Sequence, residues 1–237
     1  MKVLDSDRQI LTVLQVSFSS QELEEKTRQL FHSWLVHKDF ELEFYHLFSL
    51  RYKLLFGSTV YEQALLLLLQ NYYRNEFFVK EVLYSELLKD NYYLSEYPVG
   101  DCRADVISFC KSFPVCYEIK TKYDSLSRLE KQICTYTAIF PYTSVVCSED
   151  KRNDVLQMIP EYCGLYYYKD RSNCRIIKQR GATLSPVLDN MAILSCFRSD
   201  ERRREFGSND SETISATYSS HELSSRLACR LKSRIGK

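Results

Sequence analysis

Three charged residues near the middle of the sequence have the types and the spacing to hold a metal ion. Asp105 opens an apolar run that is typical of a β-strand, and Glu118 and Lys120 close the next such run. Residues two apart on a strand point to the same face, so Glu118 and Lys120 lie side by side. If the two strands pair as a hairpin, Asp105 and Glu118 approach each other near one end of it.

The chemistry of this group follows from its charges. Two neighbouring carboxylates repel each other unless a cation lies between them. Oxygen ligands suit Mg²⁺ or Mn²⁺, and the backbone carbonyl of Ile119 is a further candidate ligand. A lysine on the same face can orient a water molecule or stabilise charge that grows on a phosphate. The structural alternative is a surface ion pair between Glu118 and Lys120, with Asp105 capping the turn before it.

The segments around these residues predict a mixed sheet. Apolar runs and turn sequences indicate three consecutive strands, and a helix with a 3.6-residue period follows until Pro141 ends it. The fold class is therefore α/β in the broad, mixed α+β sense, with a central mixed β-sheet flanked by helices. The strands are expected at 92–97, 104–109, 115–120, 143–147, 165–168 and 174–177, and the helix at 125–140.

Three regions are expected along the chain. Residues 1–58 form an N-terminal helical extension, in which 19–56 is a helical hairpin that begins with a Ser19–Glu22 capping box. Residues 59–206 form the core. Residues 207–237 are rich in Ser, Thr, Asn and Asp and then in Arg and Lys, which predicts a flexible basic C-terminal tail. The alternative from Ser219 onward is a weak basic amphipathic helix with Leu223, Leu227 and Leu231 on one face.

The central motifs resemble a known family. Arg103-Ala104-Asp105, then Tyr117-Glu118-Ile119-Lys120-Thr121, then Asp124, Arg128, Leu129, Gln132 and Tyr136 follow one another in register. This order resembles the PD-(D/E)xK superfamily of metal-dependent nucleases, and within it a small bacterial group of restriction-nuclease-like proteins, the sce-type family. The likeness covers roughly residues 75–180. Ala104 stands where the superfamily's name has proline.

The resemblance implies roles for individual residues and a restriction-endonuclease-like core. Asp105 and Glu118 would bind Mg²⁺ or Mn²⁺, Lys120 would assist the attacking water, and Gln132 would lie near the metal or the phosphate. Members often add a glutamate from the helix before the sheet, for which Glu76 is the first candidate and Glu81 the second. Candidate substrate-binding residues are Arg103, Thr121, Arg128 and Tyr136. The alternative for the helix is that Arg128, Gln132 and Tyr136 form an ordinary solvated face.

The expected function is hydrolysis of the DNA backbone, in defence against foreign DNA or in repair. DNA is the expected partner, a homodimer is possible, and no organic cofactor is expected. The alternative is a catalytically idle module that binds nucleic acid or regulates, with a nuclease-like fold. A weaker alternative is an interaction scaffold that uses the 19–56 hairpin and the tail.

Composition limits the other possibilities. The 237 residues carry a formal net charge of +1, which argues against a surface that binds polyanions everywhere but leaves room for a local basic groove. The nine cysteines form no CxxC pair, which argues against a zinc site and predicts reduced, buried thiols such as Cys116 and Cys147. The absence of a signal-like segment and of a run long enough to span a membrane predicts a cytoplasmic protein without membrane contact.

Overall fold

The computed structural model describes residues 5–89, 91–110, 113–169 and 174–235. The chain divides into two compact units, residues 1–79 with 171–174 and residues 80–170 with 175–237. The division falls inside one helix, after Val79, whereas the sequence prediction placed a boundary after residue 58.

The first unit is helical and has an aromatic core. Phe44 is fully buried, and its ring stacks on Phe48 at 4.7 Å and meets Phe56 edge-on at 5.6 Å. The predicted capping box is present, since the Glu22 amide donates to the Ser19 hydroxyl and the Glu22 carboxylate accepts from the Ser19 amide. The helices are α1 (Asp5–Ser17), α2 (Ser20–Leu35), α3 (Phe40–Phe48), α4 (Tyr52–Phe56), α5 (Tyr61–Tyr72) and the first turn of α6 (Glu76–Glu86).

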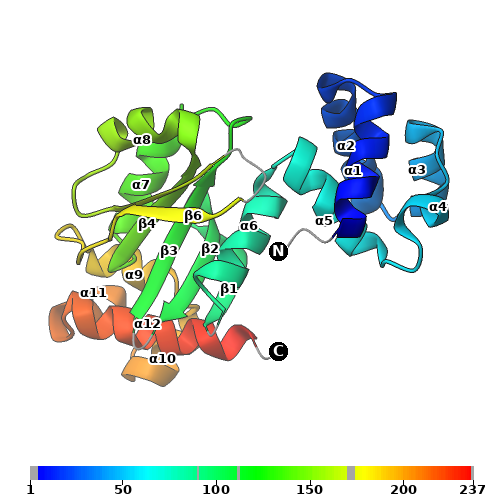
Figure 1. The fold of residues 1–237 in the computed structure, drawn as a ribbon. Coiled ribbons are helices and arrows are strands. Elements are labelled where there is room, and N and C mark those ends of the chain that lie inside the picture. The colour runs from blue at the N-terminus through cyan, green and yellow to red at the C-terminus, as the bar shows by residue number, and fades with distance from the viewer. Residues whose placement is uncertain (1–4, 90, 111–112, 170–173, 236–237) are drawn as a thin grey trace. The chain divides into compact units, whose positions relative to one another are not determined.

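The second unit is built on a six-stranded mixed sheet in the order β1-β2-β3-β4-β5-β6 (Figure 1). The first three strands are antiparallel, β3, β4 and β5 run parallel, and β6 returns antiparallel. The mixed α/β class is therefore as the sequence predicts. The strands are β1 (Tyr92–Val99), β2 (Cys102–Cys110), β3 (Phe113–Lys120), β4 (Tyr142–Ser148), β5 (Gly164–Tyr168) and β6 (Ile176–Arg180).

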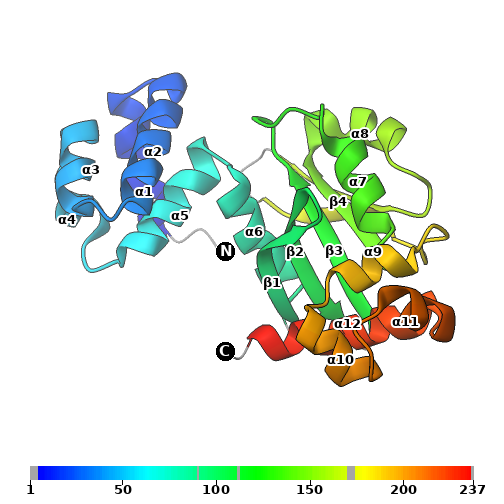
Figure 2. The ribbon, with the colours of Figure 1, turned by 180° about the vertical axis from the view of Figure 1, so that it is seen from behind.

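Helices flank this sheet. Seen from behind, α7, α8 and α9 lie over the same face of the strands (Figure 2). The sheet helices are α7 (Leu129–Thr137), the short 3₁₀ helix η1 (Glu149–Lys151), α8 (Arg152–Met158), α9 (Asn190–Ser195), α10 (Ser199–Phe206), α11 (Ser211–Thr217) and α12 (Ser220–Ile235).

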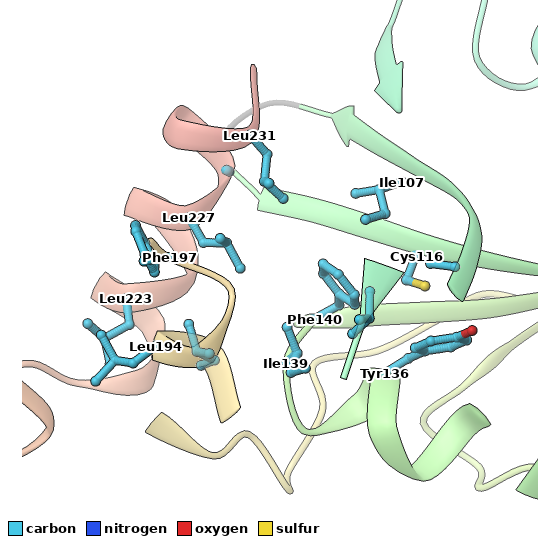
Figure 3. Close-up of a cluster of buried hydrophobic side chains, with 14 of the residues drawn as sticks. Ile107, Cys116, Tyr136, Ile139, Phe140, Leu194, Phe197, Leu223, Leu227 and Leu231 are labelled. Atoms are coloured by element: carbon cyan, nitrogen blue, oxygen red, sulfur yellow. The ribbon is translucent and has the colours of Figure 1, made fainter. Parts of the chain in front are cut away.

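One hydrophobic core joins the sheet to helices that are distant in sequence (Figure 3). Ile107 and Cys116 from neighbouring strands pack with Tyr136 of α7 and with Phe140, which lies just after that helix. The other side of the cluster is supplied by Leu194, Phe197, Leu223, Leu227 and Leu231 from α9, the segment after it and α12. This core fixes β2, β3 and α7 with respect to one another.

The C-terminal region differs from the prediction of a flexible tail over residues 207–237. Asp210 caps α11, and Ser219 with Glu222 forms the start of α12, where the Ser219 amide donates to Glu222 Oε2 at 2.9 Å. The buried stripe of α12 includes Leu223 and Leu227. The few apolar residues in this region are therefore spaced to bury one face of a helix, while its many charges lie on the other faces.

The described residues show two further features of the composition. Cys116, Cys147 and Cys163 are buried, whereas Cys134 and Cys229 are exposed, so the prediction of buried thiols holds for only part of the described cysteines. Within the described part of the chain, no helix has both the length and the apolar character to cross a membrane.

Candidate functional site

The predicted charged residues meet where β2 and β3 part. The last paired residues on this side are Val106 and Tyr117, so the next position outward sets Asp105 opposite Glu118. The Asp105 carboxylate turns to β3, where its Oδ2 accepts a hydrogen bond of 2.6 Å from the Ile119 amide. Asp105 therefore spans the two strands and is not a cap of the preceding turn.

Glu118 is the most enclosed member of the group, with 1% of its surface exposed. Its Oε1 accepts two hydrogen bonds, from Lys120 Nζ at 2.7 Å and from Gln132 Nε2 at 2.5 Å. Its Oε2 is buried and has no partner. Burial raises the pKa of Glu118, although the Lys120 ammonium acts in the opposite direction.

The local sequence explains why α7 presents Gln132 to β3. Leu129, Ile133 and Tyr136 recur at helical spacing and are buried, so they fix the rotation of α7 against the sheet. Between β3 and α7, Asp124 accepts hydrogen bonds of 2.7 Å from both the amide and the hydroxyl of Thr121. This tight turn closes the loop directly after Lys120.

Two charged residues near the site were missed by the sequence prediction. A carboxylate oxygen of Glu96 lies within 4.8 Å of one of Asp105. In the register, Ser95 pairs with Val106 and Tyr97 with Ala104, which sets Glu96 across from Asp105. The ammonium of Lys80, which is largely buried, forms an ion pair with Glu96 Oε1.

Glu96 also has an unusual backbone. Its φ is 54°, in the left-handed region, although it lies within a strand and is not glycine. Such a conformation is uncommon for a glutamate. An exposed glutamate within a strand sequence gives no local sign of this conformation.

Both candidate glutamates of the helix before the sheet are half-buried. Glu76 is half-buried at the first position of α6 and belongs to the first unit, whereas Asp105 and Glu118 belong to the second. Its role as a fourth ligand stays a prediction. Glu81, the second candidate, is half-buried, and burial raises its pKa.

The four predicted substrate-binding residues fall into two pairs. Arg103 and Arg128 are exposed and available to a ligand. Thr121 and Tyr136 are buried, and the Tyr136 hydroxyl donates to the Arg103 carbonyl at 2.7 Å. Thr121 and Tyr136 therefore position the backbone in this structure and do not offer a surface to substrate.

The residues present fit a small divalent cation. Asp105 and Glu96 place hard carboxylate oxygens within 4.8 Å of each other, and Glu118 Oε2 is a buried carboxylate acceptor without a donor. A buried carboxylate oxygen without a donor is costly, and a cation beside it would remove that cost. The carbonyl of Ile119 is a predicted ligand that lies next to Glu118 on the same strand.

Comparison with known proteins places the chain in a family. No curated protein sequence matches it. A solved structure, a protein of unknown function from Silicibacter pomeroyi, is 17% identical with a TM-score of 0.33, over 46% of this chain and 70% of that one. A family model described as bacteriophage P4 protein cII matches residues 69–233, which include all six strands. Because this match spans well over half of the sequence, the chain belongs to the bacteriophage P4 protein cII family.

Proposed function

We propose that this protein is a Mg²⁺-dependent phosphodiesterase of the PD-(D/E)xK type that hydrolyses the DNA backbone. The observation that supports the proposal is Glu118, whose Oε1 is held by Lys120 and Gln132 while its buried Oε2 has no partner. A carboxylate held in this way is oriented before any ligand arrives, which is the form that metal sites require.

The residues of the chain have separable tasks in this proposal. Asp105 and Glu118 would hold the ion, which when bound supplies a Lewis acid for the phosphate and lowers the pKa of a water molecule. Gln132 fixes the orientation of Glu118. The Lys120 ammonium, next to Glu118, orients the attacking water and stabilises charge that develops on the phosphoryl oxygens.

The surroundings of the group favour a nucleic acid as substrate. The side chains of Arg103 and Lys131 are 66% and 65% exposed, and Arg128 is exposed at the start of α7. Exposed arginine and lysine side chains are the groups that contact phosphates along a backbone. The choice of DNA rests on the family resemblance of the motifs.

One observation favours a second candidate, a binding module without catalysis. The Lys120 ammonium already forms an ion pair with Glu118, so part of the site's charge is neutralised internally. In that case the protein binds DNA equally well with and without a chelator and cleaves none of its forms. Defence against foreign DNA and repair are both settings in which either candidate could act.

The test is cleavage of plasmid, duplex, single-stranded and branched DNA by the full chain, with Mg²⁺, with Mn²⁺ or with EDTA. Asp105→Asn, Glu118→Gln and Lys120→Met are each expected to lower the metal-dependent rate at least about 100-fold. Matched controls are the exposed residues Asp154→Asn, Glu161→Gln and Lys122→Met, which keep the rate. Full metal-dependent activity in Glu118→Gln would show that the assignment is wrong.

A further inference from the structure

The site contains two lysines as well as its carboxylates. Glu96, Asp105 and Glu118 come from three neighbouring strands, and Lys80 and Lys120 are ion-paired with the two outer carboxylates. We call these five residues the carboxylate row. Three carboxylates and two ammonium groups give the row a net charge of −1, so it is one positive charge short of balance.

The two ends of the row differ in what they still lack. At the Glu96 end, the Lys80 ammonium is in direct contact with Oε1, and its side chain is only 11% exposed. At the Glu118 end, Lys120 and Gln132 both bind Oε1 and leave the buried Oε2 without a partner. A cation is therefore already present at one end, and an acceptor without a donor remains at the other.

We propose that the Lys80 ammonium occupies the place of a second metal ion, so that the site takes one divalent cation, bound by Asp105 and Glu118. This inference rests on the proposed metal-dependent function and specifies its metal count. Glu96 and Asp105 approach within 4.8 Å, a separation at which one cation can serve both carboxylates. In a two-metal site a second ion would lie there, whereas here Glu96 is neutralised by a side chain of the protein.

Another cation near Glu96 does not replace Lys80 in this role. Arg103 Nη1 lies 4.0 Å from Glu96 Oε2, and the arginine side chain is 66% exposed. An exposed pair at that distance is weak and screened by salt. Lys80 is the enclosed partner, because it reaches Glu96 from α6 with its aliphatic stem buried.

The test counts bound Mn²⁺ by equilibrium dialysis of the full chain. The wild type is expected to bind one ion per chain, and Lys80→Met, which keeps the length of the side chain without its charge, is expected to bind two. Lys80→Arg keeps the charge and is expected to bind one. Lys80→Met combined with Glu96→Gln removes the added ligand and returns the count to one. Electron paramagnetic resonance of Lys80→Met should show a coupled Mn²⁺ pair that the wild type lacks.

The outcomes separate this inference from the proposed function. Two ions on the wild type, or one ion on folded Lys80→Met, would overturn the role of Lys80 and leave the nuclease proposal intact. No ion on the wild type would remove the metal site itself. Circular dichroism verifies the fold of each variant, and a wild-type count of two ions overturns the role of Lys80 even if Lys80→Met does not fold.

Discussion

Two clusters of charged residues in the second unit differ in whether their charges are balanced. The carboxylate row holds Glu96, Asp105, Glu118, Lys80 and Lys120, and leaves Glu118 Oε2 without a partner. A second cluster, which we call the C-terminal clamp, joins α10 to α12 through the pairs Glu201–Arg234 and Glu205–Arg230. Its two arginines balance its two glutamates, and both oxygens of Glu201 accept from Arg234.

The net pKa shifts of the carboxylates Glu118 and Glu201 have opposite directions. Burial raises the pKa of Glu118 and is not fully offset by Lys120. Burial acts in the same direction on Glu201, but the amide of Arg198 and the guanidinium of Arg234 outweigh it and lower the pKa of Glu201. Both oxygens of Glu201 accept hydrogen bonds, whereas Glu118 keeps Oε2 without a donor. This difference is expected when the first carboxylate stabilises the fold and the second binds a ligand.

The largest effect is expected from opening the clamp. Arg234→Met removes the partner of Glu201 and the contact with the Tyr97 hydroxyl, and leaves a buried carboxylate unpaired. The loss in the free energy of unfolding is expected to be about 3–5 kcal/mol, measured by urea denaturation. The matched control is Arg204→Met, whose exposed pair with Asp200 should contribute less than about 0.5 kcal/mol.

The sequence predicts the residues of the row that local spacing brings together, and it misses those that depend on packing between distant segments. Asp105, Glu118 and Lys120 were predictable because strand spacing and hairpin pairing bring them together, and Gln132 followed from the family resemblance of the helix motif. Lys80 and Glu96 were not, since their pairing depends on how α6 lies against β1 and on a left-handed glutamate. The substrate role of Tyr136 came from the family resemblance, whereas its place in the apolar period of the helix fits the buried position that it has.

The clamp shows a missed signal of another kind. The apolar spacing of Leu223, Leu227 and Leu231 was recognised, but low overall hydrophobicity favoured a tail. The Ser219–Glu222 pair has the same capping signature as Ser19–Glu22, which begins α2. The cap and the apolar spacing, taken together, predict a helix where α12 lies.

A metal ion should stabilise the row and leave the clamp unaffected. With Mg²⁺ at about 100 times its dissociation constant, the free energy of unfolding of the wild type is expected to rise by about 2.7 kcal/mol. Because protons compete with the ion for Glu118, whose pKa is raised, this gain should increase as the pH rises above the ordinary range of a glutamate. Thermal unfolding at several pH values measures it. Glu118→Gln should lose the gain and Glu201→Gln should keep it; equal gains in both variants would contradict the proposed metal site.

Without metal, the two glutamates should give opposite pH profiles of stability. The pKa of Glu118 is raised on folding, so the folded chain binds more protons than the unfolded chain and this residue lowers stability as the pH rises through that window. Glu118→Gln removes the anionic partner of the enclosed Lys120 ammonium, so it is expected to lose stability at neutral pH, and this loss should shrink as the pH rises. The pKa of Glu201 is lowered, so its contribution is present above the ordinary pKa of a glutamate and is lost as the pH falls through the lowered value. Urea titrations of both variants between about pH 2 and 9 cover the lowered pKa of Glu201 and the raised pKa of Glu118, and they measure the two slopes. Parallel profiles would abolish the distinction between the clusters.

The smallest effect concerns the backbone of Glu96. This residue is held at a φ of 54°, whereas the four charged residues of the clamp lie in regular helices. Ser49 has the same φ at the C-terminal cap of α3, a place where left-handed residues are common, and therefore serves as the control. Ser49→Gly relieves the backbone and is expected to gain about 0.5 kcal/mol. Glu96→Gly relieves the same strain but removes the partner of the enclosed Lys80 ammonium, so no net gain is expected. Urea denaturation of the two variants in parallel compares them; a gain for Glu96→Gly equal to that of Ser49→Gly would mean that the Lys80 pair does not hold Glu96 in its left-handed conformation.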